Sequence, residues 1–409
     1  MRRTSRIEHT HWHRGHDKLT VGRAISRHFF DAARLYGVRI AAFDASTLAD
    51  AESRMLAIEV VPLTAGTAKL AEREEPVLSE GSVLVETLAI GVCGTDREIV
   101  AGNYGRPSPG EANLVLGHES LGRVIEAPAG SSVAAGDLVV GIVRRPDPVP
   151  CANCAAGEWD MCRNGRYTEC GIKERHGFCR ERFRIEPEFV VKLAPHLKKT
   201  GVLLEPASIL AKAWEHIDYI GRRARWLPKV ALVTGAGPVG LLAALMAKQR
   251  GLDVIVFDRV ESGLKPELVR RLGGKYATGD VEELGTTADV IVECTGYGPL
   301  VFKCMRQTPP GGIVCLTGIS TAGRKLEIDP GLINRDVVLE NDVIFGSVNA
   351  NRRHYEAAAK SLAAADPGWL ERIISRRLPL SAWRDALQPM PDAVKTVIDF
   401  TQDRLPNDS

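Results

Sequence analysis

Two short stretches of the chain carry the residue types from which a catalytic metal site can be built. Residues 93–96 read Cys-Gly-Thr-Asp, and residues 117–119 read Gly-His-Glu. A thiolate, an imidazole and a carboxylate are ligands of Zn²⁺, and a catalytic zinc keeps one position open for water or substrate. A buried cysteine or a core histidine would explain either stretch alone, but the two together favour a metal. We therefore predict that Cys93, His118 and Glu119 bind a catalytic zinc ion.

Two further side chains of the first stretch would serve such a site. Thr95 lies two residues beyond Cys93, so its hydroxyl could face the open position and relay the proton of a bound alcohol. Asp96 could orient His118, because a metal-bound imidazole usually donates its other ring N–H to a carboxylate or carbonyl. We predict catalytic roles for Thr95 and Asp96.

A second group of thiols lies downstream. Cys151, Cys154 and Cys162 follow the spacing C-x2-C-x7-C, which is typical of a loop around a structural zinc. A tetrahedral site needs a fourth ligand, and Asp147 and Cys170 are both candidates. The alternative is a loop of three reduced thiols without a metal.

A glycine-rich turn indicates a bound dinucleotide. Residues 235–240 read Gly-Ala-Gly-Pro-Val-Gly, between an apolar β-like run at 229–234 and a helix-like run at 241–248. In that setting the glycines let the backbone approach a pyrophosphate, and the helix N-terminus attracts its charge. We predict cofactor contacts from the turn residues Gly235, Gly237, Pro238, Val239 and Gly240.

The next strand carries the residue that bears on cofactor choice. It spans residues 253–257 and ends at Asp258, roughly 20 residues past the turn, where an acid can hold the adenosine ribose hydroxyls. A carboxylate there repels the 2′-phosphate of NADP. The charge predicts NAD as the preferred cofactor, and NADP is the alternative because Arg259 could meet a phosphate.

The wider sequence predicts the elements that hold these residues. Short β-like runs punctuated by glycine between residues 55 and 143 predict a partly open β-barrel. Strands that alternate with helices from 229 to 345 predict an α/β, doubly wound parallel sheet. The runs 377–380 and 394–400 are interpreted as strands that return to the first domain, with Lys395 as an exposed strand lysine.

The predicted domain organisation follows from these elements. We expect a zinc-containing catalytic domain of residues 55–206 and 350–409 and a dinucleotide-binding domain of residues 207–349. Residues 1–54 hold half of the histidines and many arginines, and we expect a disordered extension there.

The bulk composition excludes some functions. The chain has 409 residues, is 44% hydrophobic and carries a net charge of +2, so no electrostatic case exists for nucleic acid or an anionic membrane. No apolar run approaches the ~20 residues that cross a bilayer. The nine cysteines are few for this length and indicate a reducing compartment, which we expect to be the cytoplasm.

These motifs resemble the zinc-dependent medium-chain alcohol dehydrogenase superfamily. Within it, residues 93–99, 114–119 and 143–146 resemble the glucose 1-dehydrogenase branch, and the similarity runs from about Met55 to Phe400. The resemblance implies a GroES-like barrel, a Rossmann domain, and a homo-oligomer (a dimer or a tetramer). The family's structural zinc loop has four cysteines, and Pro148 stands at the first of those positions here.

The resemblance also implies roles for individual residues. Glu205 becomes the fourth ligand of the catalytic zinc, directly or through water, and Glu119 shares that role. Glu169 binds sugar hydroxyls, and Asn349 contacts both the nicotinamide and the sugar. The further cofactor contacts lie after three strands, at Thr295, Gly296, Thr317, Gly318, Ile319, Ser347 and Val348.

The sequence thus predicts an enzyme that passes a hydride from the C1 hydroxyl of an aldose, glucose above all, to NAD(P) and gives the aldonolactone. The sugar contacts would come from Thr95, Glu169, Glu205 and Asn349. A polyol or amino-alcohol dehydrogenase is the alternative within the class. A non-catalytic NAD(P)-binding redox sensor is the alternative from another class, although a sensor has no need of an open metal site.

Overall fold

The computed structural model describes residues 54–320, 323 and 325–402. The predicted extension, residues 1–54, lies outside the described residues except for Arg54, where β1 (Arg54–Val60) begins. Among the described residues, no helix is both long and apolar enough to span a membrane.

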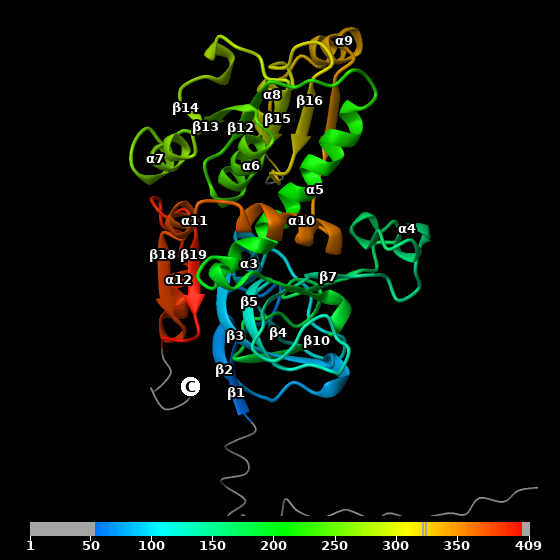
Figure 1. Ribbon diagram of the computed structural model, residues 1–409, viewed down its shortest axis with the longest axis vertical. Coiled ribbons are helices and arrows are strands. Elements are labelled where there is room, and N and C mark those ends of the chain that lie inside the picture. Colours follow the sequence, from blue (N-terminus) through cyan, green and yellow to red (C-terminus); the bar gives the residue numbers. More distant parts are fainter. Residues whose placement is uncertain (1–53, 321–322, 324, 403–409) are drawn as a thin grey trace, which may run out of the picture. The chain divides into compact units, whose positions relative to one another are not determined.

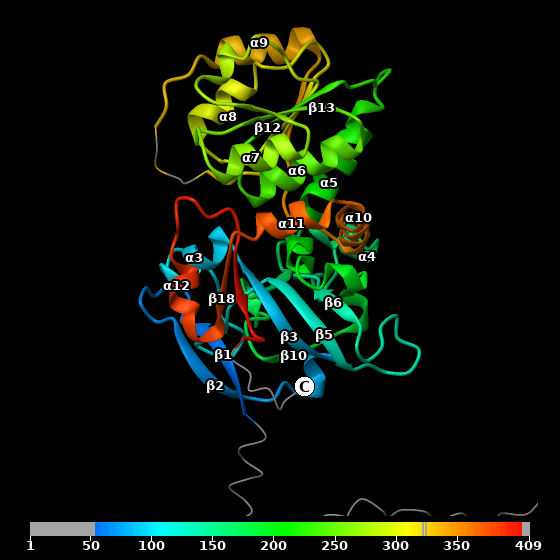
Figure 2. The same cartoon turned by 60° about the vertical axis from the view of Figure 1, so that its left-hand side comes forward.

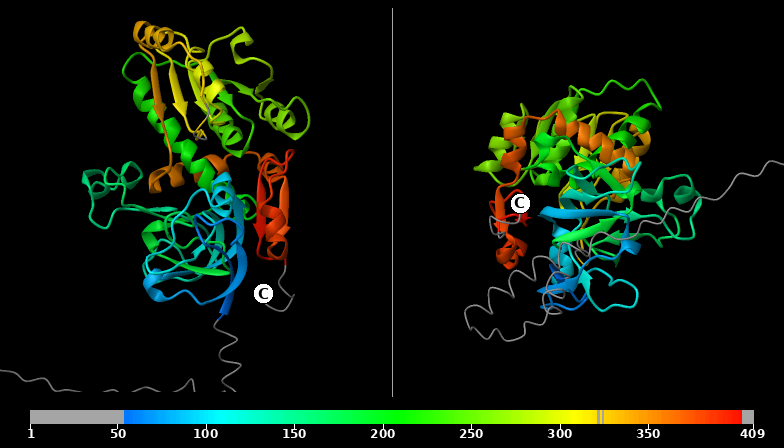
Figure 3. Two further views of the ribbon diagram at one scale, coloured as in Figure 1. Left: turned by 180° about the vertical axis from the view of Figure 1, so that it is seen from behind. Right: turned by 60° about the horizontal axis from the view of Figure 1, so that its bottom comes forward.

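The largest sheet joins strands from both ends of the described chain. Its strand order is β11-β6-β5-β3-β19-β18, and β10 also pairs with β3. Figure 3 shows β18 and β19, in red, beside the blue β3. The C-terminal strands β18 and β19 thus lie in the same sheet as β3. The members are β3 (Val83–Val92), β5 (Glu119–Glu126), β6 (Leu138–Gly141), β10 (Arg182–Ile185), β11 (Val190–Lys192), β18 (Arg376–Pro379) and β19 (Thr396–Asp399).

The burial of β3 explains its place at the centre of this sheet. Its side chains alternate between buried and half-buried from Val83 to Leu88, and all are buried from Ala89 to Val92. Alternation is typical of a strand with one face on the core, whereas continuous burial marks a strand covered on both faces. The end of β3 that leads into Cys93 is therefore enclosed.

Two three-stranded sheets complete this part of the chain. One has the order β2-β1-β4, with β2 (Lys69–Glu74) and β4 (Leu114–Val115) on either side of β1. Figure 2 shows β1 and β2 of this sheet, in blue, side by side. The other has the order β7-β8-β9, formed by β7 (Arg144–Arg145), β8 (Thr168–Cys170) and β9 (Glu174–Arg175).

The second main sheet is parallel and has six strands in the order β14-β13-β12-β15-β16-β17 (Figure 1). Counted along the chain this is the order 3-2-1-4-5-6 of a dinucleotide-binding domain. Its central strands are apolar and buried, because helices pack against the sheet; α6 packs against β12, β13 and β15. The strands are β12 (Val230–Thr234), β13 (Asp253–Phe257), β14 (Lys275–Ala277), β15 (Val290–Glu293), β16 (Ile313–Leu316) and β17 (Val343–Gly346).

The helices connect these sheets, and α5 packs on both α6 and α10. It runs unbroken across residue 206, where the sequence predicts a domain boundary, and that division stays a prediction. The helices are α3 (Gly94–Val100), α4 (Ala152–Ala155), α5 (Leu204–Gly221), α6 (Pro238–Gln249), α7 (Leu264–Arg271), α8 (Gly298–Cys304), α9 (Pro330–Glu340), α10 (Arg352–Ala363), α11 (Pro367–Ile373) and α12 (Trp383–Leu387).

Candidate active site

The two stretches with metal-ligand chemistry meet at the end of β3. The ligand atoms of Cys93, His118 and Glu119 all lie within 4.8 Å of one another. Cys93 follows β3 directly and caps the N-terminus of α3, while Glu119 opens β5 and pairs with Gly91 of β3. The antiparallel pairing of β3 with β5 therefore brings the motifs together, and the donor set fits Zn²⁺.

Glycine is required beside this group. A Cβ atom at Gly91 would lie 2.1 Å from Glu119 Oε2, so a larger residue would displace the carboxylate. Gly117 has φ +88°, a conformation that favours glycine, and a Cβ there would meet Cys179 at 2.9 Å. Gly91 therefore keeps room for the side chain of Glu119, and Gly117 lets the chain before His118 pack closely against Cys179.

Asp96 contacts His118. Its Oδ2 accepts the N–H of Cys93 at 2.8 Å, and its Oδ1 lies 3.3 Å from His118 Nδ1. Burial alone would lower the pKa of His118, but the charge of Asp96 and its contact with the ring raise that pKa well above the usual value. Asp96 therefore favours the imidazole in a form that is protonated or bound to a cation.

Lys395 is not the exposed strand lysine that the sequence predicts; that prediction is wrong. Its residue is 2% exposed, its Nζ donates to Val92 O at 3.1 Å, and it forms an ion pair with Glu119 Oε2. Burial would lower the pKa of Lys395, but the negative charge of Glu119 raises it. A buried ammonium thus balances one carboxylate of the candidate metal group.

Glu205 and Thr95 lie near the group of Cys93, His118 and Glu119. Glu205 sits in the first turn of α5, is 8% exposed, and has a pKa raised to about 7, chiefly by burial. The charges of His118, Glu119 and Lys395 all act on it, but among the described residues it is not part of the compact three-residue group. The Oγ1 of Thr95 lies 3.9 Å from Cys93 Sγ.

Glu169 and Asn349 come together from distant parts of the chain. Asn349 Nδ2 donates to Glu169 Oε1 at 2.8 Å. Arg144 donates to the same oxygen from Nε at 3.1 Å and from Nη2 at 3.0 Å, and it stacks on the Tyr167 ring at 3.6 Å. Oε1 of Glu169 is thereby saturated, whereas Oε2 accepts no hydrogen bond from the described residues. Sequence reasoning missed Arg144, although it lies within the quoted stretch 143–146.

Beneath Glu169 a buried polar network joins the cysteine loop to α5 and α10. Arg144 Nη1 donates to Asp160 O at 3.1 Å, and Lys212 Nζ lies 2.8 Å from Asp160 Oδ2. Asn351 Nδ2 also donates to Asp160 at 2.9 Å, while the N–H of Asn351 donates to His354 Nδ1 at 3.1 Å. This network holds Asp160, and through it Arg144, in place.

His354 gives the fold a specific pH dependence. Burial, the largest cause, lowers the pKa of His354 to about 4, whereas an unfolded histidine titrates near 6.5. As pH falls below about 6.5 the unfolded chain takes up a proton that the folded chain does not, so stability falls until the folded pKa is reached. From pH 7 to pH 5 this residue alone should remove about 2 kcal/mol of unfolding free energy.

The measurement is urea unfolding of the wild type and of His354→Gln at pH 7, 6 and 5. The stability difference between the two proteins should shrink by that amount as the pH falls. Parallel pH curves for the two proteins would contradict this assignment.

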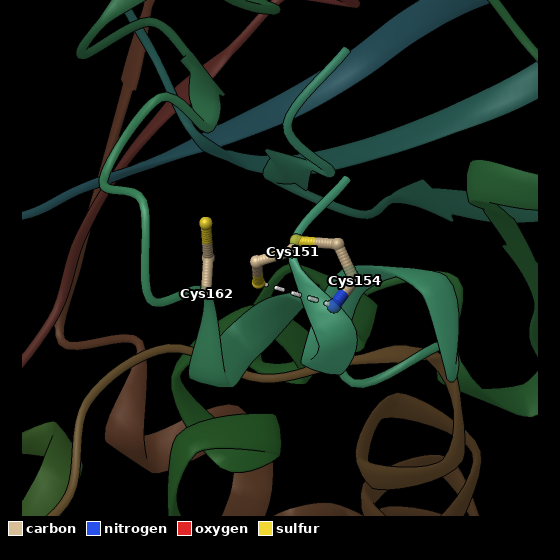
Figure 4. A group of neighbouring side chains, drawn as sticks. All are labelled: Cys151, Cys154 and Cys162. Carbon is tan, nitrogen blue, oxygen red and sulfur yellow. Dashed lines mark hydrogen bonds between the residues drawn. The ribbon is translucent and has the colours of Figure 1, made fainter. Parts of the chain in front are cut away.

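The three cysteines of the downstream loop also cluster. Their Sγ atoms lie within 4.8 Å of one another (Figure 4). Backbone N–H groups of Arg163 and Cys154 point at Cys151 and lower its pKa to about 6. The cluster of Cys151, Cys154 and Cys162 has the chemistry of a thiolate metal site.

The structure does not add a fourth ligand to this cluster. Asp147 accepts the N–H of Val149 and the side-chain amide of Asn164, each at 2.8 Å. Cys170 is buried on β8. Among the described residues neither of them belongs to the compact thiol group.

The glycine turn after β12 has the geometry that a pyrophosphate requires. Gly235 has φ +88°, and a Cβ atom at Gly240 would lie 1.8 Å from Gly235 O. Pro238 occupies the first turn of α6 and Val239 follows it, while a Cβ at Gly237 would meet open space. The turn therefore exposes its backbone at the N-terminus of a twelve-residue helix, where an anion binds favourably.

The other predicted cofactor residues follow the carboxyl ends of β15, β16 and β17. Gly318 packs so closely on the preceding loop that a Cβ there would lie 2.1 Å from Gly296 N. Ile319 and Val348 are exposed, and Ser347 is buried. Thr295 N donates to the buried Glu293 at 2.7 Å, and Thr317 Oγ1 donates to Glu293 O at 2.8 Å. Glu293 was not among the residues predicted from the sequence. An acidic residue at the end of an apolar strand was a signal for a side chain that holds the loop after that strand.

Known families of dehydrogenases match most of this chain. Residues 79–195 match the alcohol dehydrogenase GroES-like domain, and residues 198–400 match the glucose dehydrogenase C-terminus. The chain is 38% identical over 359 residues to glucose 1-dehydrogenase of Methanocella arvoryzae. The alignment covers 85% of this chain and 99% of that protein. The chain is also 36% identical over 350 residues to glucose 1-dehydrogenase of Thermoproteus tenax, covering 84% and 99%.

A solved structure gives the same result. Haloferax mediterranei glucose dehydrogenase in complex with NADP, Zn and gluconolactone matches with a TM-score of 0.79 and 31% identity, over 85% of this chain and 99% of that one. A GroES-like domain followed by a parallel dinucleotide-type sheet defines the class as medium-chain dehydrogenases. The chain belongs to the glucose 1-dehydrogenase branch of this zinc-dependent superfamily.

Proposed function

We propose that the protein is a zinc- and NAD(P)-dependent dehydrogenase that oxidises the C1 hydroxyl of an aldose, with glucose the first candidate, to the aldonolactone. The observation that carries the proposal is the compact group of Cys93, His118 and Glu119 at the end of β3. Relatives named glucose 1-dehydrogenase align with this chain over nearly their whole length. The Haloferax structure, with its gluconolactone, supports the sugar and the product.

The residues around the metal group have distinct roles in this proposal. A bound zinc ion lowers the pKa of an attached hydroxyl, as it lowers that of water to about 7. Thr95 relays the hydroxyl proton, and Asp96 keeps His118 oriented through Nδ1. Lys395 holds Glu119 Oε2, and Glu205, with its pKa raised to about 7, can take up a proton near neutral pH or serve as a further ligand.

Glu169 and Asn349 select sugar hydroxyls. Because three N–H donors occupy Oε1 of Glu169, only Oε2 remains to accept a sugar hydroxyl. An analogue without that hydroxyl would cover Oε2 without pairing it, and such sites reject deoxy analogues strongly. Thr95 and Glu205 complete the sugar contacts on the metal side.

The dinucleotide lies along the carboxyl ends of the parallel sheet, where ligands of open α/β sheets bind. Its pyrophosphate meets the 235–240 turn, and its nicotinamide half meets the loops after β15, β16 and β17. The charge of Asp258, taken alone, favours NAD. We further propose the two-domain division at residues 206 and 349, a homo-oligomeric state and a cytoplasmic location; the nine free cysteines support a reducing compartment.

The test is a panel of aldoses, polyols and simple alcohols, each run with NAD and with NADP. Oxidation of glucose or a close aldose, with a lactone product, supports the proposal. Reduction of the cofactor by polyols or amino-alcohols but by no aldose would overturn the sugar assignment. Dinucleotide binding without turnover, unchanged by Cys93→Ala, would instead indicate a redox sensor.

Metal content tests the two thiol-containing sites separately. We expect two zinc ions per chain in the wild type and one in Cys162→Ala, because that variant breaks only the downstream cluster. Loss of a structural ion should lower Tm by roughly 5 °C while aldose oxidation persists. A wild type that holds one zinc ion, also retained by Cys162→Ala, would mean that the cysteine loop is metal-free.

A further inference from the structure

The carboxylate of Asp258 is already engaged by the protein. Its Oδ2 accepts the N–H of Ala236 at 2.6 Å, and its Oδ1 accepts the N–H of Val260 at 3.0 Å. Lys265 Nζ donates to Oδ2 at 3.2 Å. A carboxylate has about four lone-pair directions, so about one is left for a ribose hydroxyl. Asp258 therefore holds the glycine turn and the loop that follows β13, and little of its hydrogen-bonding capacity is left for a ribose.

Lys265 changes the net charge around the Asp258 carboxylate. It lies in the first turn of α7, its side chain is 19% exposed, and its ammonium pairs with Asp258. Arg259, next in the chain, is exposed. The ammonium of Lys265 thus balances the carboxylate of Asp258, so the repulsion of a 2′-phosphate that Asp258 would cause by itself is offset, and Arg259 adds an exposed cation next in the chain. A lysine on a flexible stem can also turn from the carboxylate to a phosphate.

We propose that Lys265 is a specificity-determining residue for the dinucleotide, which together with Arg259 binds the 2′-phosphate and lets the site accept NADP as well as NAD. The inference rests on the proposed use of a dinucleotide but not on the identity of the sugar. In this proposal Asp258 mainly holds the conformation of the glycine turn and of the loop after β13. Its carboxylate therefore does not by itself exclude NADP.

The experiment uses fragments that carry neither nicotinamide nor sugar substrate. Binding of adenosine 2′,5′-bisphosphate and of 5′-AMP is measured by calorimetry on the zinc-loaded full-length wild type, Lys265→Met, Lys265→Arg and Lys192→Met. The last variant removes a lysine that pairs with Asp137 at 2.8 Å in the barrel sheet, so it is a matched control. Because no turnover is involved, failure of the proposed aldose oxidation would leave this readout intact.

We expect the wild type to bind the bisphosphate at least as tightly as 5′-AMP. Lys265→Met should weaken the bisphosphate roughly tenfold, the size of a lost hydrogen bond to a charged group, and should change 5′-AMP binding by less than about twofold. Lys265→Arg should retain bisphosphate binding, and Lys192→Met should match the wild type. A wild type that prefers 5′-AMP tenfold, or a Lys265→Met variant that loses both ligands equally, would overturn the proposal.

Discussion

Replacing Cys93 by alanine is expected to remove the catalytic metal and to lower kcat/KM for aldose oxidation roughly a thousandfold or more, about 4 kcal/mol of transition-state stabilisation. The thiol is one of three ligand atoms packed within 4.8 Å, and its loss leaves only His118 and Glu119 in that group. The measurement is zinc content by elemental analysis alongside steady-state kinetics.

Cys304→Ala is the control for this variant. Cys304 is fully buried in the parallel-sheet half of the described chain and belongs to neither thiol cluster. It should cost packing stability but leave the zinc content and kcat/KM near the wild-type values. A Cys93→Ala protein that keeps its zinc and most of its activity would contradict the assignment of the site.

Replacing Lys395 by methionine is expected to destabilise the fold by about 4 kcal/mol, because Glu119 would be left as a buried, unpaired carboxylate. Both side chains are only 2% exposed, and Asp96 and Glu205 lie in the same electrostatic neighbourhood. A bound cation can replace the ammonium, so the loss should be largest in EDTA and smaller with excess zinc. Urea unfolding under both conditions measures the effect.

Lys69→Met provides the matched control, since it removes another Lys–Glu pair. Lys69 Nζ lies 3.2 Å from Glu59, but the Lys69 side chain is 58% exposed. Exposed pairs contribute at most about 1 kcal/mol, and this loss should not depend on zinc. Equal stability of the wild type and Lys395→Met in EDTA would show that the buried pair has no such role.

Local sequence patterns predicted most of the elements that one continuous stretch of chain forms. β13 occupies residues 253–257 as predicted, and the glycine turn sits between β12 and α6. Several strands escaped prediction, and β2 and β14 are examples. Both are edge strands: β2 is rich in charged residues, and β14 has only three residues. Edge strands commonly carry charge, because it prevents unwanted pairing, and this removes the apolar alternation by which a strand is found.

Pairings between distant residues could not be found in this way. Lys395 reaches Val92 across 303 positions, and Asn349 reaches Glu169 across 180. The lysine is buried because β19 is an interior strand between β3 and β18, which only the sheet order reveals. The role of Lys265 likewise depends on a side chain from α7 meeting the end of β13.

The most direct test of the central claim is the fate of the hydrogen on C1. The protein, loaded with zinc, is given D-[1-²H]glucose with NAD or NADP, and the reduced cofactor and the sugar product are analysed by mass spectrometry. The proposed reaction predicts one deuterium on the nicotinamide ring and a gluconolactone without deuterium at C1. Reduced cofactor without deuterium, or none formed from any C1-deuterated aldose, would contradict it.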